Sequence, residues 1–168
     1  MQYSTEPLNE RHHRDDFFCG KVPLDNYIKL QAGQDIKRKL RVCFVLIYRE
    51  DDLDKVKGYY TLSNEGIPRD LVPEFYQKKF PKSYHSIPTT LIGRLARDQQ
   101  FKGIRVGEFL LLDALYKCFI ASKTVASFAV VVDPIDDEAV SFYQKYGFQS
   151  LPDSWRMFLP MKTVEQLF

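Results

Sequence analysis

The sequence predicts a mixed α+β domain in which helices flank one central sheet. Segments rich in Val, Ile, Phe, Leu and Tyr, typical of strands, lie at residues 41–49, 55–62, 89–97, 125–132 and 156–161. Apolar residues recur at helical spacing in residues 24–37, 107–122 and 136–146. The order is one helix, two neighbouring strands, and then strand–helix–strand–helix–strand, which is typical of an α+β fold.

The first half of the chain contains one predicted helix and one predicted strand pair. Pro23 suits the opening turn of the helix at residues 24–37. The strands at residues 41–49 and 55–62 are separated only by an aspartate-rich turn at residues 51–54, so we expect them to pair in antiparallel fashion.

The second half begins with a proline-rich stretch. Four prolines in residues 67–88 predict irregular structure, with a short helix near residues 74–78. The later strand at residues 125–132 is almost continuously apolar, which is expected of a strand buried on both faces. The helix at residues 136–146 should end at Gly147, because glycine is the commonest residue just past a helix C-terminus.

The composition indicates one soluble, cytoplasmic domain spanning residues 1–168. A hydrophobic content of 45% with 27% charged residues is ordinary for a globular domain of this length. Three cysteines form no CxxC pair, so a disulfide framework is not expected, and His12, His13 and His85 show no metal-ligand spacing. The N-terminus lacks a signal peptide, and the apolar run at residues 42–48 is much shorter than the roughly 20 residues that cross a bilayer.

A basic, glycine-containing turn precedes the helix at residues 107–122. A turn that opens a helix presents unpaired backbone N–H groups at the positive end of the helix dipole, which is a pyrophosphate-binding arrangement. The alternative is a solvated basic turn with no ligand. The candidate anion-binding residues are Lys102, Gly103, Ile104, Arg105, Val106, Gly107 and Glu108.

A second segment carries aromatic residues on the helix at residues 136–146. Ala139, Phe142 and Tyr146 share one helical face, Tyr143 lies beside it, and Gly147-Phe148 follows. By itself this segment favours a packed helix whose aromatic side chains only fill the core.

Together, the two segments resemble the acyl-CoA-binding core of the GNAT superfamily of N-acetyltransferases. The resemblance implies a single mixed, mostly antiparallel sheet with a splayed strand pair, flanked by helices. It implies acetyl-CoA as cosubstrate without a metal, backbone contacts of Leu95, Ala96 and Arg97 with the pantetheine arm, and Tyr143 as the catalytic acid. In the preferred alignment with the family's phosphate loop, Lys102 takes the first position and Gly107 the last, while Arg105 stands where glycine is usual. The alternative alignment starts at Gln100 and makes Gly103 the glycine, but it ends on Arg105, which is not small.

The chain also resembles the GNAT toxins of bacterial toxin–antitoxin pairs along its whole length. The matching motifs are Phe18-Cys19-Gly20 with Leu24-Asp25, Gly58-Tyr59-Tyr60, Gly93-Arg94-Leu95-Ala96, Tyr143 and Leu159-Pro160-Met161. This resemblance implies acetylation of the α-amino group of aminoacyl-tRNA and a ribbon–helix–helix antitoxin as partner. Homodimerisation is a further expectation, and no membrane contact is expected.

The sequence is therefore compatible with three functions. The first is transfer of acetyl to aminoacyl-tRNA, and the second is transfer to small amines, protein N-termini or lysines. The third is a non-catalytic acyl-CoA-binding module. The net charge of +2 is modest for a tRNA-binding protein, although basic clusters lie at residues 37–41 and 78–82. Glu65 is a candidate base for the amine by its position, and a water relay is the alternative.

Overall fold

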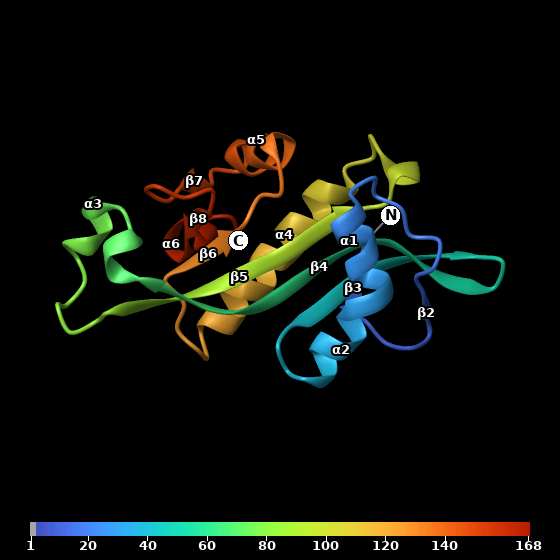
Figure 1. The fold of residues 1–168 in the computed structure, drawn as a ribbon, viewed down its shortest axis with the longest axis horizontal. Coiled ribbons are helices and arrows are strands. Elements are labelled where there is room, and N and C mark those ends of the chain that lie inside the picture. The colour runs from blue at the N-terminus through green and yellow to red at the C-terminus, as the bar shows by residue number, and fades with distance from the viewer. Residues whose placement is uncertain (1–2) are drawn as a thin grey trace. The chain divides into compact units, whose positions relative to one another are not determined.

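The structure, a computed structural model, describes residues 3–168 and contains one mixed sheet (Figure 1). Its strands are β1 (Thr5–Pro7), β2 (His12–His13), β3 (Val42–Glu50), β4 (Leu53–Pro68), β5 (Ser86–Arg97), β6 (Ala129–Val132), β7 (Gln149–Ser150) and β8 (Met157–Pro160). The strand order is β1-β3-β4-β5-β6-β8-β7, and β2 pairs with β4. The pairs β1–β3, β3–β4, β6–β8 and β7–β8 are antiparallel, whereas β2–β4 and β5–β6 are parallel, so the predicted mostly antiparallel sheet is confirmed.

The helices lie between and after these strands. They are α1 (Val22–Asn26), α2 (Ala32–Lys37), α3 (Glu74–Gln77), α4 (Val106–Ser122), α5 (Asp137–Lys145) and α6 (Met161–Glu165). A π-helical turn, Tyr27–Gln31, joins α1 to α2, and short 3₁₀ turns occupy Arg69–Leu71 and Gln99–Phe101. In residues 3–168, no helix is long and apolar enough to cross a membrane.

The chain divides into two compact units, and neither unit is a continuous stretch of sequence. The first contains residues up to Ser63 together with Gly93–Ala114, and the second contains Asn64–Ile92 together with Leu115–Phe168. Strands β4 and β5 and helix α4 each belong to both units, because a unit boundary falls inside each of these elements.

In the first unit, the α1–α2 segment packs on the sheet through aromatic residues. Tyr27 and Ile28 join a buried cluster with Val45 and Tyr59. The rings of Tyr27 and Tyr59 are stacked with centroids 6.2 Å apart, and the Tyr59 hydroxyl donates to the carbonyl of Leu24 at 2.7 Å. The predicted helix at residues 24–37 is confirmed, but it begins at Val22 and contains the π-helical turn.

The β3–β4 hairpin is tighter than the sequence suggested. Asp51 and Asp52 both have positive φ, 52° and 60°, as the central residues of a type I′ turn require. Aspartate tolerates this conformation, so a two-residue turn suffices. The turn predicted at residues 51–54 is therefore too long, and the strand predicted at residues 55–62 is too short.

In the second unit, β6 is shorter than predicted. The parallel register pairs Thr89 with Ala129 and Ile92 with Val132, and all four β6 residues are buried. The expectation of a strand buried on both faces is confirmed for these residues. The prediction is wrong for residues 125–128, because the N–H of Val125 still bonds to Ala121 at the end of α4.

The C-terminal elements follow the sequence signals at their ends. The Asp136 carboxylate caps α5 by accepting from the N–H of Ala139 at 2.9 Å, and Gly147 ends this segment with φ +92°. The closing strand is confirmed as β8, with α6 after it. All three cysteines are free and buried, as expected, and burial raises the pKa of both Cys43 and Cys118 to about 12.

Candidate functional site

The first feature of the candidate site is the point where β5 loses its parallel neighbour. Pairing with β6 ends at Ile92 and Val132, yet β5 continues to Arg97. The backbone of residues 93–97 therefore has no partner in the β6 register. Leu95, Ala96 and Arg97, the residues expected to pair with the pantetheine arm, lie in this extension.

The end of this extension is anchored by Asp98. This buried carboxylate accepts the N–H of Phe18 and the N–H of Gln100, each at 3.0 Å. The N–H of Gln99 donates to the carbonyl of Phe18 at 2.9 Å, and Asp25 accepts the N–H of Cys19 at 2.7 Å. The Phe18-Cys19-Gly20 motif thus fixes the chain where β5 ends. Sequence reasoning gave Asp98 no role, and the only signal was its position after the strand.

The other end of the extension holds Gly93 against the buried Nη1 atom of the half-buried Arg41 side chain. A Cβ atom at Gly93 would lie 1.9 Å from Nη1 of Arg41 and 3.0 Å from Oγ1 of Thr61. Both of these polar atoms are buried and have no hydrogen-bond partner among the described residues. The neighbouring Arg94 guanidinium lies 3.8 Å from the centroid of the Tyr27 ring. Gly93 therefore leaves the space that the Arg41 guanidinium occupies.

The loop after β5 has the backbone shape expected of an anion-binding turn. Lys102, Gly103, Ile104 and Arg105 are exposed, and α4 begins at Val106. The first turn of an α-helix leaves its N–H groups without intrahelical partners. Positively charged side chains at residues 102 and 105 flank this helix start, and the Arg105 guanidinium lies 4.0 Å from the Glu108 carboxylate.

Arg105 has φ +60°, the left-handed conformation that glycine adopts most easily. A non-glycine residue in this conformation costs of order 1–2 kcal/mol. Gly103 also has a positive φ, +86°, so the loop contains a left-handed residue at the glycine position of either alignment.

Tyr143 lies on α5 in the second unit, and its side chain is buried, with 7% of the residue exposed. Its ring packs against Phe142 at 5.2 Å and Phe148 at 5.3 Å. Burial, and then the negative charge of Asp133, raise the pKa of the Tyr143 phenol well above its usual range. The phenol is therefore protonated throughout the neutral range, as a proton donor must be.

Glu65, the candidate base, is held by hydrogen bonds within the second unit. Its Oε2 accepts from Nη2 of Arg156 at 3.2 Å, and its Oε1 accepts the N–H of Gly66 at 3.2 Å. Arg156 also donates to both oxygens of Asp133, at 2.7 Å and 2.9 Å. One guanidinium therefore ties together Glu65 and the carboxylate that acts on Tyr143.

Two of the three histidines, His12 and His13, have carboxylate partners. Nε2 of His12 lies 2.5 Å from the Glu6 carboxylate, and that of His13 lies 3.3 Å from Asp16. Within the described part of the chain, no group of three His, Cys, Asp or Glu side chains is placed to hold a metal ion.

Comparison with known proteins identifies relatives along nearly the whole chain, although no protein-family model matches. The chain is 35% identical over 172 residues to a probable toxin TacT of Sinorhizobium fredii, covering 96% of this chain and 93% of that protein. It is 29% identical over 152 residues to a tRNA-acetylating toxin of Mycobacterium tuberculosis, covering 90% and 87%.

Solved structures share the fold. A tyrosine-to-phenylalanine mutant of KacT is similar with a TM-score of 0.92 and 28% identity, covering 100% of both chains. AtaT complexed with acetyl-methionyl-tRNAfMet gives a TM-score of 0.89 and 27% identity, covering 99% of both. AtaTR bound with acetyl-CoA gives 0.85 and 27%, covering 99% of this chain and 98% of that one.

The contact between Gly93 and Arg41 can be tested with a double-mutant cycle. Gly93→Ala should displace the Arg41 guanidinium and lower the free energy of unfolding by about 1 kcal/mol, a small overpacking penalty because a flexible side chain moves. In an Arg41→Ala background the added methyl group should cost less, because its nearest obstacle is gone. Denaturant midpoints of the four proteins measure this coupling, and additive effects would show that the two residues do not compete for space.

Proposed function

Because the chain belongs to the family of GNAT toxins that includes the probable toxin TacT, we propose that it transfers acetyl from acetyl-CoA to the α-amino group of aminoacyl-tRNA. The observation that carries this proposal is the nearly full-length similarity to a tRNA-acetylating toxin and to AtaT bound to acetyl-methionyl-tRNAfMet. The proposed unit of function is the whole chain, residues 1–168.

The proposed acetyl-CoA site uses the β5 extension and the loop after it. The pantetheine arm carries amide groups, so it can pair with the strand backbone near Leu95 and Arg97 as another strand would. The N–H groups at the start of α4 would bind the pyrophosphate, and Lys102 and Arg105 would add charge–charge attraction. A strand N–H near Leu95 or Ala96 would polarise the thioester carbonyl and stabilise its oxyanion.

The reaction proposed is a direct displacement. The neutral amine nitrogen attacks the thioester carbonyl carbon, the C–N bond forms, and the C–S bond breaks as CoA leaves. The departing sulfur receives a proton from the Tyr143 hydroxyl. The amine loses a proton to water, and solvent then returns a proton to the Tyr143 oxygen. Because the pKa of Tyr143 is raised, full proton transfer is unfavourable until the thiolate charge has developed. The phenol therefore acts first as a hydrogen-bond donor to sulfur.

A water relay is favoured over Glu65 as the acceptor of the amine proton. Both carboxylate oxygens of Glu65 already accept hydrogen bonds, from Arg156 and from the N–H of Gly66. An oxygen that already accepts a hydrogen bond is less available to take a proton from the amine. The α-amino group of an aminoacyl ester is less basic than a lysine side chain, so more of it is already neutral near pH 7.

Membership of this family also suggests where in the cell the protein acts and which proteins it binds. Toxins of this kind act within toxin–antitoxin pairs, and we propose a ribbon–helix–helix antitoxin as the protein partner. The cytoplasm, which contains tRNA and acetyl-CoA, is the proposed location. Homodimerisation is proposed as well.

Gly107→Glu should abolish acetyl-CoA binding, because it adds bulk and negative charge at the start of α4, where the pyrophosphate is proposed to bind. Lys102→Ala and Arg105→Ala should each weaken binding only partly, since backbone N–H groups provide much of the anion contact. Titration calorimetry with CoA measures all three variants. Unchanged affinity of the Gly107 variant would mean that the loop is only a turn.

Tyr143→Phe should keep the fold and the affinity for acetyl-CoA while lowering the rate of acetyl transfer about 10²–10⁴-fold, the usual cost of losing an acid catalyst. In the wild-type enzyme the raised pKa predicts no loss of activity from Tyr143 deprotonation below about pH 10, the ordinary phenol value. Steady-state rates of wild type and variant from slightly acidic to mildly alkaline pH test both statements, because aminoacyl esters hydrolyse quickly in more alkaline solution. A variant rate within a few-fold of wild type would remove Tyr143 from this role.

The acceptor is tested with radiolabelled acetyl-CoA and tRNA. We expect label on aminoacylated tRNA only, and transfer that weakens as salt rises, because tRNA affinity depends strongly on phosphate contacts. Uncharged tRNA is the matched control. Label on polyamines or peptide N-termini, with none on charged tRNA, would contradict the proposed acceptor while leaving the acetyltransferase chemistry intact.

A further inference from the structure

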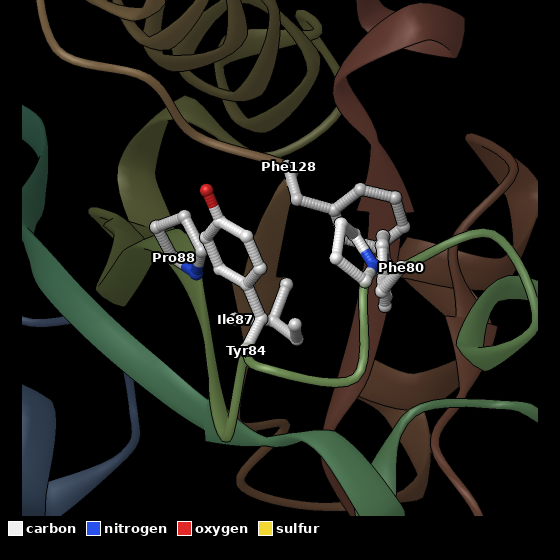
Figure 2. Close-up of a pocket in the computed structure, with 6 residues that line it drawn as sticks. Phe80, Tyr84, Ile87, Pro88 and Phe128 are labelled. Carbon is white, nitrogen blue, oxygen red and sulfur yellow. The ribbon is translucent and has the colours of Figure 1, made fainter.

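A small apolar recess lies in the second unit, in the connection between β4 and β5. It has a volume of about 220 Å³ and is lined by Phe80, Pro81, Tyr84, Ile87, Pro88 and Phe128. Figure 2 shows Tyr84, Ile87 and Pro88 on one side of the recess and Phe80 with Phe128 on the other. This volume is below the roughly 300–1,000 Å³ typical of small-molecule pockets, so the recess suits one ring-sized group.

Half of the residues that line the recess are aromatic, and one of these aromatic rings is open to solvent. The rings of Phe80 and Phe128 are perpendicular, with centroids 5.0 Å apart, and Tyr76 packs against Phe128 at 5.5 Å. Tyr84, in contrast, is 54% exposed. An exposed aromatic ring beside a packed aromatic cluster provides a flat surface on which another ring can stack.

The loop that carries these residues is held in place by a single guanidinium. Arg69 donates from Nη2 to the carbonyls of Gln77 at 2.9 Å and Phe80 at 2.6 Å, and from Nη1 to those of Pro81 and Tyr84. Its own N–H donates to the carbonyl of His85 at 2.9 Å. The loop has little regular structure, yet these bonds organise it in advance of binding, which lowers the entropic cost of binding a partner.

The part of the connection that lines the recess is basic, and the acidic residues of the connection, Asp70 and Glu74, precede it. No Asp or Glu occurs from residue 75 to residue 97. Lys78, Lys79 and Lys82, in the connection between β4 and β5, are all exposed. Lysine is depleted at protein–protein interfaces, but lysines beside aromatic residues are typical of surfaces that bind single-stranded nucleic acid. The charge therefore favours RNA over a protein segment as the occupant.

We propose that this recess binds one unpaired base of the RNA substrate by stacking on Tyr84, while Lys78, Lys79 and Lys82 contact the adjacent phosphates. The proposal rests on the proposed function, because it assigns a binding surface for the same tRNA substrate. It requires no sequence preference, since every base has a flat face on which to stack.

The test measures the affinity of a fluorescent, single-stranded RNA oligonucleotide by anisotropy, without acetyl-CoA. Tyr84→Ala should weaken binding roughly 5- to 150-fold, the range for loss of one base–aromatic stack. Tyr84→Phe, which keeps the ring, should bind within about twofold of wild type. Trp155→Ala is the matched control, because Trp155 is an exposed aromatic residue (71%) that does not line the recess.

Salt dependence separates stacking from charge. Tyr84→Ala should lower the affinity by a similar factor at every salt concentration, leaving the slope of log affinity against log salt unchanged. Lys82→Ala should reduce the magnitude of that slope by about 0.7, the value for one phosphate contact to a single strand. Thermal unfolding of the Tyr84 variants checks that the fold is retained.

Two results would overturn this inference. One is RNA affinity of Tyr84→Ala equal to that of wild type or of Trp155→Ala. The other is unchanged RNA binding together with a weaker complex with the antitoxin, which would assign the recess to a protein side chain. If charged tRNA is not acetylated but the Tyr84 effect on RNA binding persists, only the proposed reaction fails. If charged tRNA is acetylated but Tyr84→Ala does not change RNA affinity, the proposed reaction stands and only the role of the recess in RNA binding is contradicted.

Discussion

The proposed cosubstrate site depends on one feature of strand register, which is that β5 continues after β6 has ended. The last parallel pair is Ile92 with Val132, and β5 extends to Arg97. Backbone N–H and C=O groups that lose a strand partner must bond to something else, because leaving them unpaired in a buried place is costly. A ligand with amide groups along an extended arm can supply that pairing, which is how a strand edge recognises an extended peptide.

Contacts within the first unit hold each end of this extension in place. At one end, Gly93 makes room for the half-buried guanidinium of Arg41, and at the other, Asp98 accepts the backbone N–H of Phe18. The loop that follows bends through the left-handed residue Arg105 into α4. Several motifs that matched the toxin family therefore have a structural explanation that is independent of catalysis.

The sequence predicted the elements whose signals are local and long enough to repeat. The β3–β4 hairpin, α4 and α5 belong to this class, and Asp136 and Gly147 marked the ends of α5 correctly. The strands β1, β2 and β7 have only two or three residues, too few for an alternating pattern, and residues 125–128 lie outside β6 although most of them are apolar. The roles of Asp98, Arg69 and Arg156 depend on contacts with residues distant in sequence, or with several backbone carbonyls at once, and a linear pattern does not reveal such contacts.

The reaction proposed is transfer of the acetyl group of acetyl-CoA to the α-amino group of an amino acid esterified to tRNA. The most direct measurement is mass spectrometry of charged tRNA that has been incubated with the enzyme and acetyl-CoA and then digested with a nuclease to release the aminoacyl-adenosine end. We expect N-acetylaminoacyl-adenosine from the complete reaction with wild-type enzyme, and unmodified aminoacyl-adenosine when acetyl-CoA is left out. Unmodified aminoacyl-adenosine from the complete reaction, with acetyl-CoA consumed on another amine present, would contradict the proposed reaction.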